Sequence, residues 1–170
     1  MKLRGGSFSL NKDNKHLAQQ SIGQGDVLIT PLHAALIAST IGNKGIMIEP
    51  SFVHSIHSNE GRTIRKFPFR NKKKVIDPIM AEKIKSMMIE TVESGTGTNA
   101  QIKGVKVAGK TGTAENPHGN PHSWFVGFAP AEDPEVAIAI IIENGGSGSK
   151  AAAPMAGKVM KKALDSIKSK

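Results

Sequence analysis

The sequence predicts an α+β fold, in which a three-stranded antiparallel sheet packs with helices and a small hairpin lies beside it. Of its 170 residues, 38% are hydrophobic, which is enough for one domain with its own core. Apolar residues follow the helical period in some segments and a strand pattern in others, with Gly, Pro and Asn between them. We expect an irregular lead-in over residues 1–20, a helical part with the hairpin over 21–104, and strands with a final helix over 105–170.

The first helix is predicted to begin after Thr30, a residue type that caps helices well, with Pro31 at the first helical position. Residues 32–41 are apolar almost all round, which indicates a buried helix. Residues 42–45 contain two glycines and end it.

A hairpin and a second helix follow. Residues 52–56 and 63–67 flank Asn59-Glu60-Gly61, which is a turn signal between two short strands. Asp77 can cap the next helix, with Pro78 at its first position. One face of this helix carries a methionine-rich stripe, which we interpret as core rather than as a binding groove: Met80, Ile84, Met87, Met88 and Thr91.

Three strands are predicted in the last part of the chain, over residues 105–111, 124–129 and 136–143. Residues 136–142 are apolar on both faces, so we expect a central strand that is covered on each side. The final helix spans about residues 151–167, with lysines largely outward. Its predicted buried stripe consists of Ala152, Ala156, Val159, Met160, Ala163, Leu164 and Ile167.

Lys110-Thr111-Gly112 is the most informative motif, and it has two interpretations. Together with Gly104 and Gly109 it matches a phosphate loop as a string. A phosphate loop requires a helix that opens at the Lys-Thr pair, because the helix amides help to hold the phosphates. Residues 105–108 instead alternate like a strand, and residues 113–121 contain two prolines and a glycine that exclude a helix. The motif therefore lies on a strand, as does the Lys-Thr-Gly of serine enzymes that bind penicillin.

Four further motifs occur in order around Lys-Thr-Gly: Ser21-Ile22-Gly23-Gln24-Gly25, Thr30-Pro31-Leu32, Glu93-Ser94-Gly95-Thr96-Gly97, and residues 124–130. Over about residues 17–164, the ordered set resembles the C-terminal part of the transpeptidase domain of a class B penicillin-binding protein. The resemblance implies a fragment of the penicillin-binding/β-lactamase-like transpeptidase fold. It implies cross-linking of bacterial peptidoglycan by acyl transfer from D-alanyl-D-alanine stem peptides, with β-lactams acylating the same serine. A fragment of a β-lactam sensor or a β-lactamase is the nearest alternative, since these proteins share Lys-Thr-Gly.

The residue types of the motif suit recognition of a peptide that ends in a carboxylate. Lys110 supplies a positive charge, and the hydroxyls of Thr111 and Thr113 can donate hydrogen bonds to that carboxylate. Gly112 lets an extended peptide come close and pair with the strand edge. By resemblance, the Thr113 backbone N–H is one half of the oxyanion hole.

Two segments are candidates for the wall of the cleft. Trp124 is a possible wall residue, although it is also explicable as core. Thr96 and Gly97 are further candidates, although a Gly/Thr loop after a helix needs no function.

By resemblance, the nucleophile motif Ser-x-x-Lys should open a helix far upstream of Lys110, and none of the segments that carry the resemblance contains it. Ser147-Gly148-Ser149-Lys150 fits the string but follows Lys110 in a glycine-rich turn, without the fixed geometry that activates a serine. Ser9-Leu10-Asn11 fits Ser-x-Asn, the family's other motif, in a segment where the family has none. We therefore predict a chain that lacks its nucleophile and is inactive alone.

The resemblance also implies partners and a location. The parent protein would act at the extracytoplasmic face of the bacterial cell membrane, with an anchor outside this chain. No run of about 18 apolar residues is present, and the N-terminus has no apolar core typical of a signal peptide. In the family, the strand at 136–143 also pairs with two strands from the start of the domain. We therefore expect its edge to bind the missing upstream part, or a second copy of the chain in a homodimer.

The formal net charge of +9 suggests a second class of function. Residues 62–74 contain seven Lys and Arg residues with Phe67 and Phe69 among them, a pattern found in some anion- and nucleic-acid-binding modules. A solvated strand end and loop explains the same pattern, so nucleic-acid binding is not favoured. His118 and His122 lie four apart in a Pro/Gly loop and there is no cysteine, so no metal site or cofactor is expected.

Overall fold

A three-stranded antiparallel sheet forms the centre of the molecule. The structure is a computed structural model and describes residues 6–7, 13–25, 27–67 and 72–169. The strands are β5 (Ala108–Ala114), β6 (His122–Ala129) and β7 (Val136–Ile142), in this order across the sheet. Trp124 of β6 lies opposite Gly112 of β5, and Ser123 lies opposite Thr113. The predicted α+β fold with a three-stranded sheet is confirmed.

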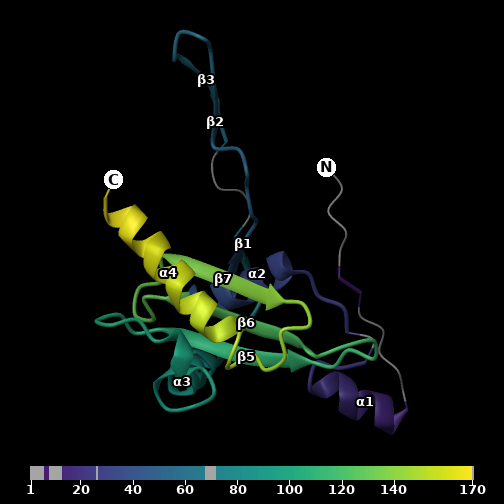
Figure 1. Cartoon of the computed structure of the whole chain (residues 1–170). Helices are drawn as coiled ribbons and strands as arrows, with labels where there is room; N and C mark the ends of the chain where they lie inside the picture. The colour runs from purple at the N-terminus through teal and green to yellow at the C-terminus, as the bar shows by residue number, and fades with distance from the viewer. Residues whose placement is uncertain (1–5, 8–12, 26, 68–71, 170) are drawn as a thin grey trace.

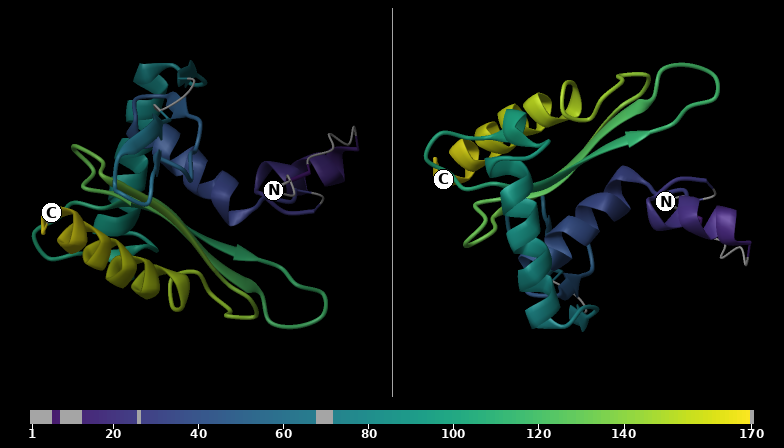
Figure 2. Two further views of the ribbon diagram at one scale, coloured as in Figure 1. Left: turned by 90° about the horizontal axis from the view of Figure 1, so that it is seen from above. Right: turned by 90° about the horizontal axis from the view of Figure 1, so that it is seen from below.

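Helices cover both faces of this sheet. Helices α2 (Pro31–Gly42) and α3 (Pro78–Glu93) lie on one face, and α4 (Ala152–Lys168) lies on the other (Figure 1, Figure 2). Phe128 packs with residues of α2 and α3, whereas Phe125 packs with residues of α4. Both rings are fully buried, and burial of each contributes about 1.5 to 3 kcal/mol.

The position of β7 corrects one prediction. Residues 136–142 were expected in a central strand, but β6 is central and β7 is an edge within the described residues. The expected cover is present, since α2 contacts β7 from one side and α4 from the other. An apolar pattern on both faces of a strand indicates that both faces are covered, here by helices, but it does not indicate whether the strand pairs on one edge or on two.

Caps start the two helices of the first face as predicted. Thr30 Oγ1 accepts a hydrogen bond from the His33 N–H at 3.2 Å, and Asp77 accepts one from the Ile79 N–H at 2.9 Å. The Ile79 N–H, with help from Lys74, lowers the pKa of the Asp77 carboxyl below its ordinary value. Both helices therefore begin at the proline that follows the cap.

Two small sheets lie outside the main one. β2 (Ser55–His57) pairs with β3 (Thr63–Lys66), which confirms the predicted hairpin, and it projects from the body of the molecule (Figure 1). β1 (Ile46–Ile48) pairs with β4 (Lys72–Lys74), a pairing that the sequence did not suggest.

The lead-in contains a helix that the sequence did not predict. Residues 1–20 were expected to be irregular, but α1 spans Asn14–Ser21. Among its residues only Gln20 is buried, so no apolar stripe announces this helix. No described helix is long and apolar enough to cross a membrane.

The predicted core stripes are only partly correct. In α3, Met88 is buried, but Met80 and Met87 are 49% and 61% exposed. Ala81 and Val92 complete the buried face instead. In α4, the predicted stripe holds except at Val159 and Ile167, which are 41% and 46% exposed. The small η1 helix (Thr98–Ala100) packs against α4.

Candidate functional site

The Lys-Thr-Gly motif lies in the middle of β5, at an edge of the sheet. β5 begins at Ala108 rather than at residue 105, and among the residues that the structure describes its only neighbouring strand is β6. Lys110 and Thr113 are exposed, whereas Thr111 is 8% exposed. The prolines and the glycine after β5 do end the strand, as expected from the sequence.

Two hydrogen bonds show which backbone groups of β5 face its open edge. The Gln24 side-chain amide donates to the Thr113 carbonyl at 3.1 Å, and Lys110 Nζ donates to the Thr111 carbonyl at 2.6 Å. In an antiparallel strand, the N–H and C=O of one residue point to the same side. The N–H groups of Thr111 and Thr113 therefore also face the open edge.

Loops on the α4 face hold the two threonine hydroxyls. Thr111 Oγ1 lies 2.6 Å from Thr96 Oγ1, and the Gly148 N–H donates to Thr113 Oγ1 at 3.3 Å. The bond at Thr113 uses an acceptor position, so its hydroxyl proton remains available. The Thr96–Thr111 pair likewise uses one of its two protons.

A groove of about 420 Å³ runs beside the end of β5. Residues 22–25 and 27–29 form one wall, and residues 112–117 form the other. Trp124, half-buried opposite Gly112, also lines this groove. Thr96 and Gly97 do not line this groove. Thr96 contacts the Thr111 hydroxyl instead, and the N–H of the buried Gly97 donates to the Thr91 carbonyl near the end of α3.

Ser123 connects the sheet to the start of α4, a role that sequence reasoning missed. It is fully buried, and its hydroxyl donates to the Ser147 carbonyl and accepts from the Ala152 N–H, both at 3.0 Å. The residue before α4 provides no side-chain cap. The Ser123 hydroxyl, which belongs to β6, therefore serves as the acceptor for the first N–H of the helix. A serine within an otherwise largely apolar strand was the one feature of the sequence that could have indicated this buried hydrogen-bonding role.

Comparison with known proteins decides the family. The family model described as the penicillin binding protein transpeptidase domain matches residues 2–161. The chain belongs to this family. A peptidoglycan D,D-transpeptidase, PbpA, of Mycolicibacterium smegmatis is 38% identical over 154 residues, which are 84% of this chain and 31% of that protein. PbpA of Mycobacterium tuberculosis is 37% identical over 161 residues, or 89% of this chain and 33% of that protein.

Solved structures of the family agree with the fold. Penicillin-binding protein A from M. tuberculosis superimposes with a TM-score of 0.87 and 35% identity, over 96% of this chain and 41% of that chain. Its ceftriaxone acyl-enzyme complex gives a TM-score of 0.87 and 36% identity, over 96% and 39%. The chain spans about a third of the length of the curated relatives, 31% and 33%.

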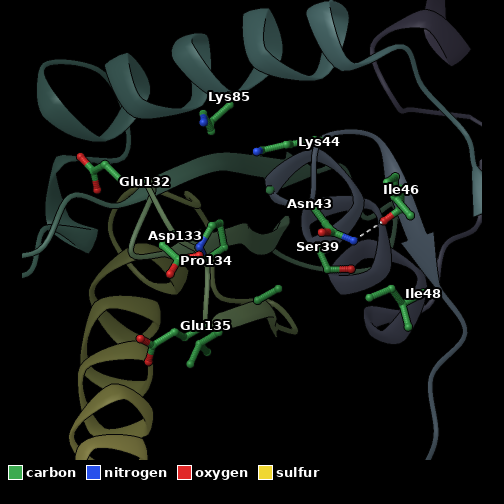
Figure 3. Close-up of a pocket in the computed structure, with 13 residues that line it drawn as sticks. Ser39, Asn43, Lys44, Ile46, Ile48, Lys85, Glu132, Asp133, Pro134 and Glu135 are labelled. Atoms are coloured by element: carbon green, nitrogen blue, oxygen red, sulfur yellow. Dashed lines mark hydrogen bonds between the residues drawn. The ribbon is translucent and has the colours of Figure 1, made fainter. Parts of the chain in front are cut away.

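A second cavity in this transpeptidase-family chain, of about 480 Å³, lies near the β6–β7 turn and contains no predicted site residue (Figure 3). Lys44 and Lys85 reach the same space as Glu132 and Asp133 (Figure 3). Lys85 is 2.7 Å from Glu82, and Glu132 is 3.4 Å from Lys106, so neighbouring charges offset these groups.

The other candidates from the sequence do not gather into a site in the described residues. Ser147 Oγ pairs with Ser149 Oγ at 2.8 Å, and Lys150 is exposed. Ser9-Leu10-Asn11 lies outside the described residues. His122 Nδ1 accepts the Asn144 N–H, and no cluster of three His, Cys, Asp or Glu is found in the part of the chain that the structure describes.

The basic segment lies on the projecting hairpin and on β4. Arg62, Arg65 and Lys66 are exposed, as are the three lysines of β4. The Arg65 guanidinium lies 4.8 Å from the centre of the half-buried Phe67 ring. Phe69 and Arg70 of the same segment lie outside the described residues.

Proposed function

We propose that this chain is part of a peptidoglycan D,D-transpeptidase and that β5 is its substrate-recognition strand. The observation that carries the proposal is the open edge of β5, where Lys110 Nζ bonds the Thr111 carbonyl and Thr113 lines a groove. An extended stem peptide would add to this edge as a further strand. The relatives' names support this substrate class.

The residues of β5 suit the two ends of the reacting group. Lys110 and the Thr113 hydroxyl would bind the terminal carboxylate, with the Thr96–Thr111 pair supplying one further proton. The N–H of Thr113 would donate to the oxygen of the scissile carbonyl as it becomes an oxyanion. A donor of this kind is worth about 2.7 to 4 kcal/mol in other enzymes.

The nucleophile would come from the upstream part of the protein. Its serine oxygen would add to the penultimate D-alanine carbonyl and lose its proton to a base. Terminal D-alanine would leave as the amine, and an amine of a second stem peptide would then displace the serine oxygen. We therefore propose that the described chain recognises the substrate but does not transfer the acyl group alone.

Covalent labelling with fluorescent penicillin, read by intact-protein mass, tests this function. The experiment compares this chain with a form that is extended upstream. Labelling of only the extended form is the expected result, in line with the acyl-enzyme complexes of the M. tuberculosis relative. Labelling of this chain would contradict the absence of a nucleophile. Labelling of neither folded form would favour the basic binding module instead.

A charge test separates Lys110 from general basicity. In the extended form, Lys110→Met is expected to slow labelling about 10- to 100-fold, since a hydrogen bond to a charged group is worth about 1.5 to 3 kcal/mol. Lys158→Met is the matched control, because Lys158 is an exposed lysine of α4, a helix that packs against β6 and β7. Equal slowing of both variants would contradict a specific role for Lys110.

We also propose that the whole protein acts at the extracytoplasmic face of the membrane and that β7 binds a further strand. Within the described residues, β7 has a neighbour on one side only, and its apolar side chains are half-buried. The isolated chain is expected to dimerise through this edge. Analytical ultracentrifugation tests this, and a clean monomer at about micromolar concentration would contradict it.

A further inference from the structure

We infer that Gln24 acts as a latch on the β5 edge, occupying the Thr113 carbonyl that an extended ligand needs. The inference rests on the proposed function of β5 as the ligand-binding strand. Gln24 Nε2 donates to the Thr113 carbonyl at 3.1 Å across 89 residues of sequence. Gln24 is thus a positioning residue at the proposed site, although it is not part of the Lys-Thr-Gly motif.

The turn that carries Gln24 has the geometry of a fixed support. Gly23 and Gly25 on either side have φ values of 78° and 70°, in the left-handed region that favours glycine. The Gln24 N–H donates to the Gln19 carbonyl at 2.9 Å, which ties the turn to the end of α1. The backbone of the turn is therefore held, and the half-buried side chain is directed at β5.

Ligand pairing and the latch compete for the same atom. A strand that pairs with Thr113 donates to its carbonyl and accepts from its N–H. Gln24 and Thr113 line the same groove, so the Gln24 amide approaches from the side that a ligand must use. A ligand amide at this position must displace the Gln24 amide, whereas the Thr113 N–H stays free for the proposed oxyanion.

The latch discriminates between ligands by whether they can donate a hydrogen bond to the Thr113 carbonyl in place of Gln24. A ligand with an amide N–H replaces the hydrogen bond that it breaks. A ligand without one gains nothing by opening the latch, and it can bind with Gln24 in place. A neutral hydrogen bond in a partly exposed site shifts an equilibrium by about two- to tenfold, so the latch tunes affinity without blocking the edge.

Acylation rates in the upstream-extended chain test the latch. Gln24→Met keeps the length of the side chain and removes its donor, and Gln19→Met is a matched control at an exposed glutamine of the same segment. Penicillin G carries an acylamino N–H, and imipenem has none. We expect Gln24→Met to react about two- to tenfold faster with penicillin G and at an unchanged rate with imipenem. The control variant should match the wild type with both.

A second measurement reads the hydrogen bond without a ligand. In this chain, the carbon-13 shift of the Thr113 carbonyl should change in Gln24→Met and stay constant in Gln19→Met. An unchanged penicillin G rate, or equal slowing with both β-lactams, would overturn the latch while leaving the proposed function intact. Absence of labelling of the extended wild type would instead overturn the proposed function, and the competition with it.

Discussion

Replacing Gly109 by alanine is expected to be the most damaging addition of a single methyl group in β5. A Cβ at Gly109 would lie 2.2 Å from Cζ and 2.8 Å from a Cε of Phe125. Phe125 is 0% exposed, so its ring has no solvent to move into. The ring also packs closely against Gly127 of the neighbouring strand, where an added Cβ would lie 2.9 Å from a Cε of Phe125.

The size of the effect follows from this contact. Carbon atoms pack best at about 3.5 to 4.0 Å, so the ring or the strand must shift by about 1 Å or more. Overpacking of this kind costs about 1 to 3 kcal/mol, and occasionally more. For a domain of this size, the melting temperature should fall by about 3 to 10 °C. The shift would also move Lys110, the next residue of the strand.

Urea unfolding of matched variants measures this cost. Gly112→Ala in the same strand is the control, because its Cβ would meet only the Trp124 side chain, at 3.2 Å, and should cost less than about 1 kcal/mol. Phe125→Leu removes the ring atoms that an added Cβ at Gly109 would meet. The double variant with Gly109→Ala should therefore be more stable than the sum of the two single effects predicts. A Gly109→Ala loss below about 0.5 kcal/mol, or strict additivity, would refute the reasoning.

Three further predictions concern the helices. Ser123→Ala should cost about 1.5 to 4 kcal/mol in urea unfolding, because the Ala152 N–H loses its partner in a buried site; exposed Ser166→Ala should change little. Thr30→Ala should remove the α2 cap and cost about 1 kcal/mol, read as a lower melting temperature. The folded pKa of Asp77 lies below its ordinary 3.8, so its stabilisation is complete above that value and is lost as the pH falls through the folded pKa. The stability difference between wild type and Asp77→Ala should therefore shrink between about pH 5 and pH 2, and a constant difference would contradict the cap.

Local signals explain the parts of the fold that the sequence predicted. Thr30 and Asp77 lie within two or three residues of the N–H groups that they cap, so a short window contains the whole interaction. The strands of the main sheet follow from apolar runs between turns in the same way. By contrast, α1 has a single buried residue, and the pairing of β1 with the lysines of β4 depends on distant segments.

In the candidate site too, local features could be predicted from the sequence, whereas long-range contacts could not. The placement of Lys110 on a strand follows from the residues on either side of it. The bond from Gln24 to Thr113 spans 89 residues, and the bond from Ser123 to Ala152 spans 29. Contacts at such separations leave no periodic trace in a sequence, so the latch and the cap of α4 required the structure.

The contacts around β5 separate its support from its proposed ligand side. Thr96 and Gly148 hold the threonine hydroxyls from the α4 face, while the Thr111 and Thr113 backbone groups face the open edge. In our proposal, recognition therefore depends on contacts within this chain, whereas acyl transfer also needs an upstream serine. The two steps should then separate in experiment. A stem peptide that shifts the β5 amide resonances without adding mass would show binding without chemistry, whereas a peptide that shifts none would place recognition outside this strand.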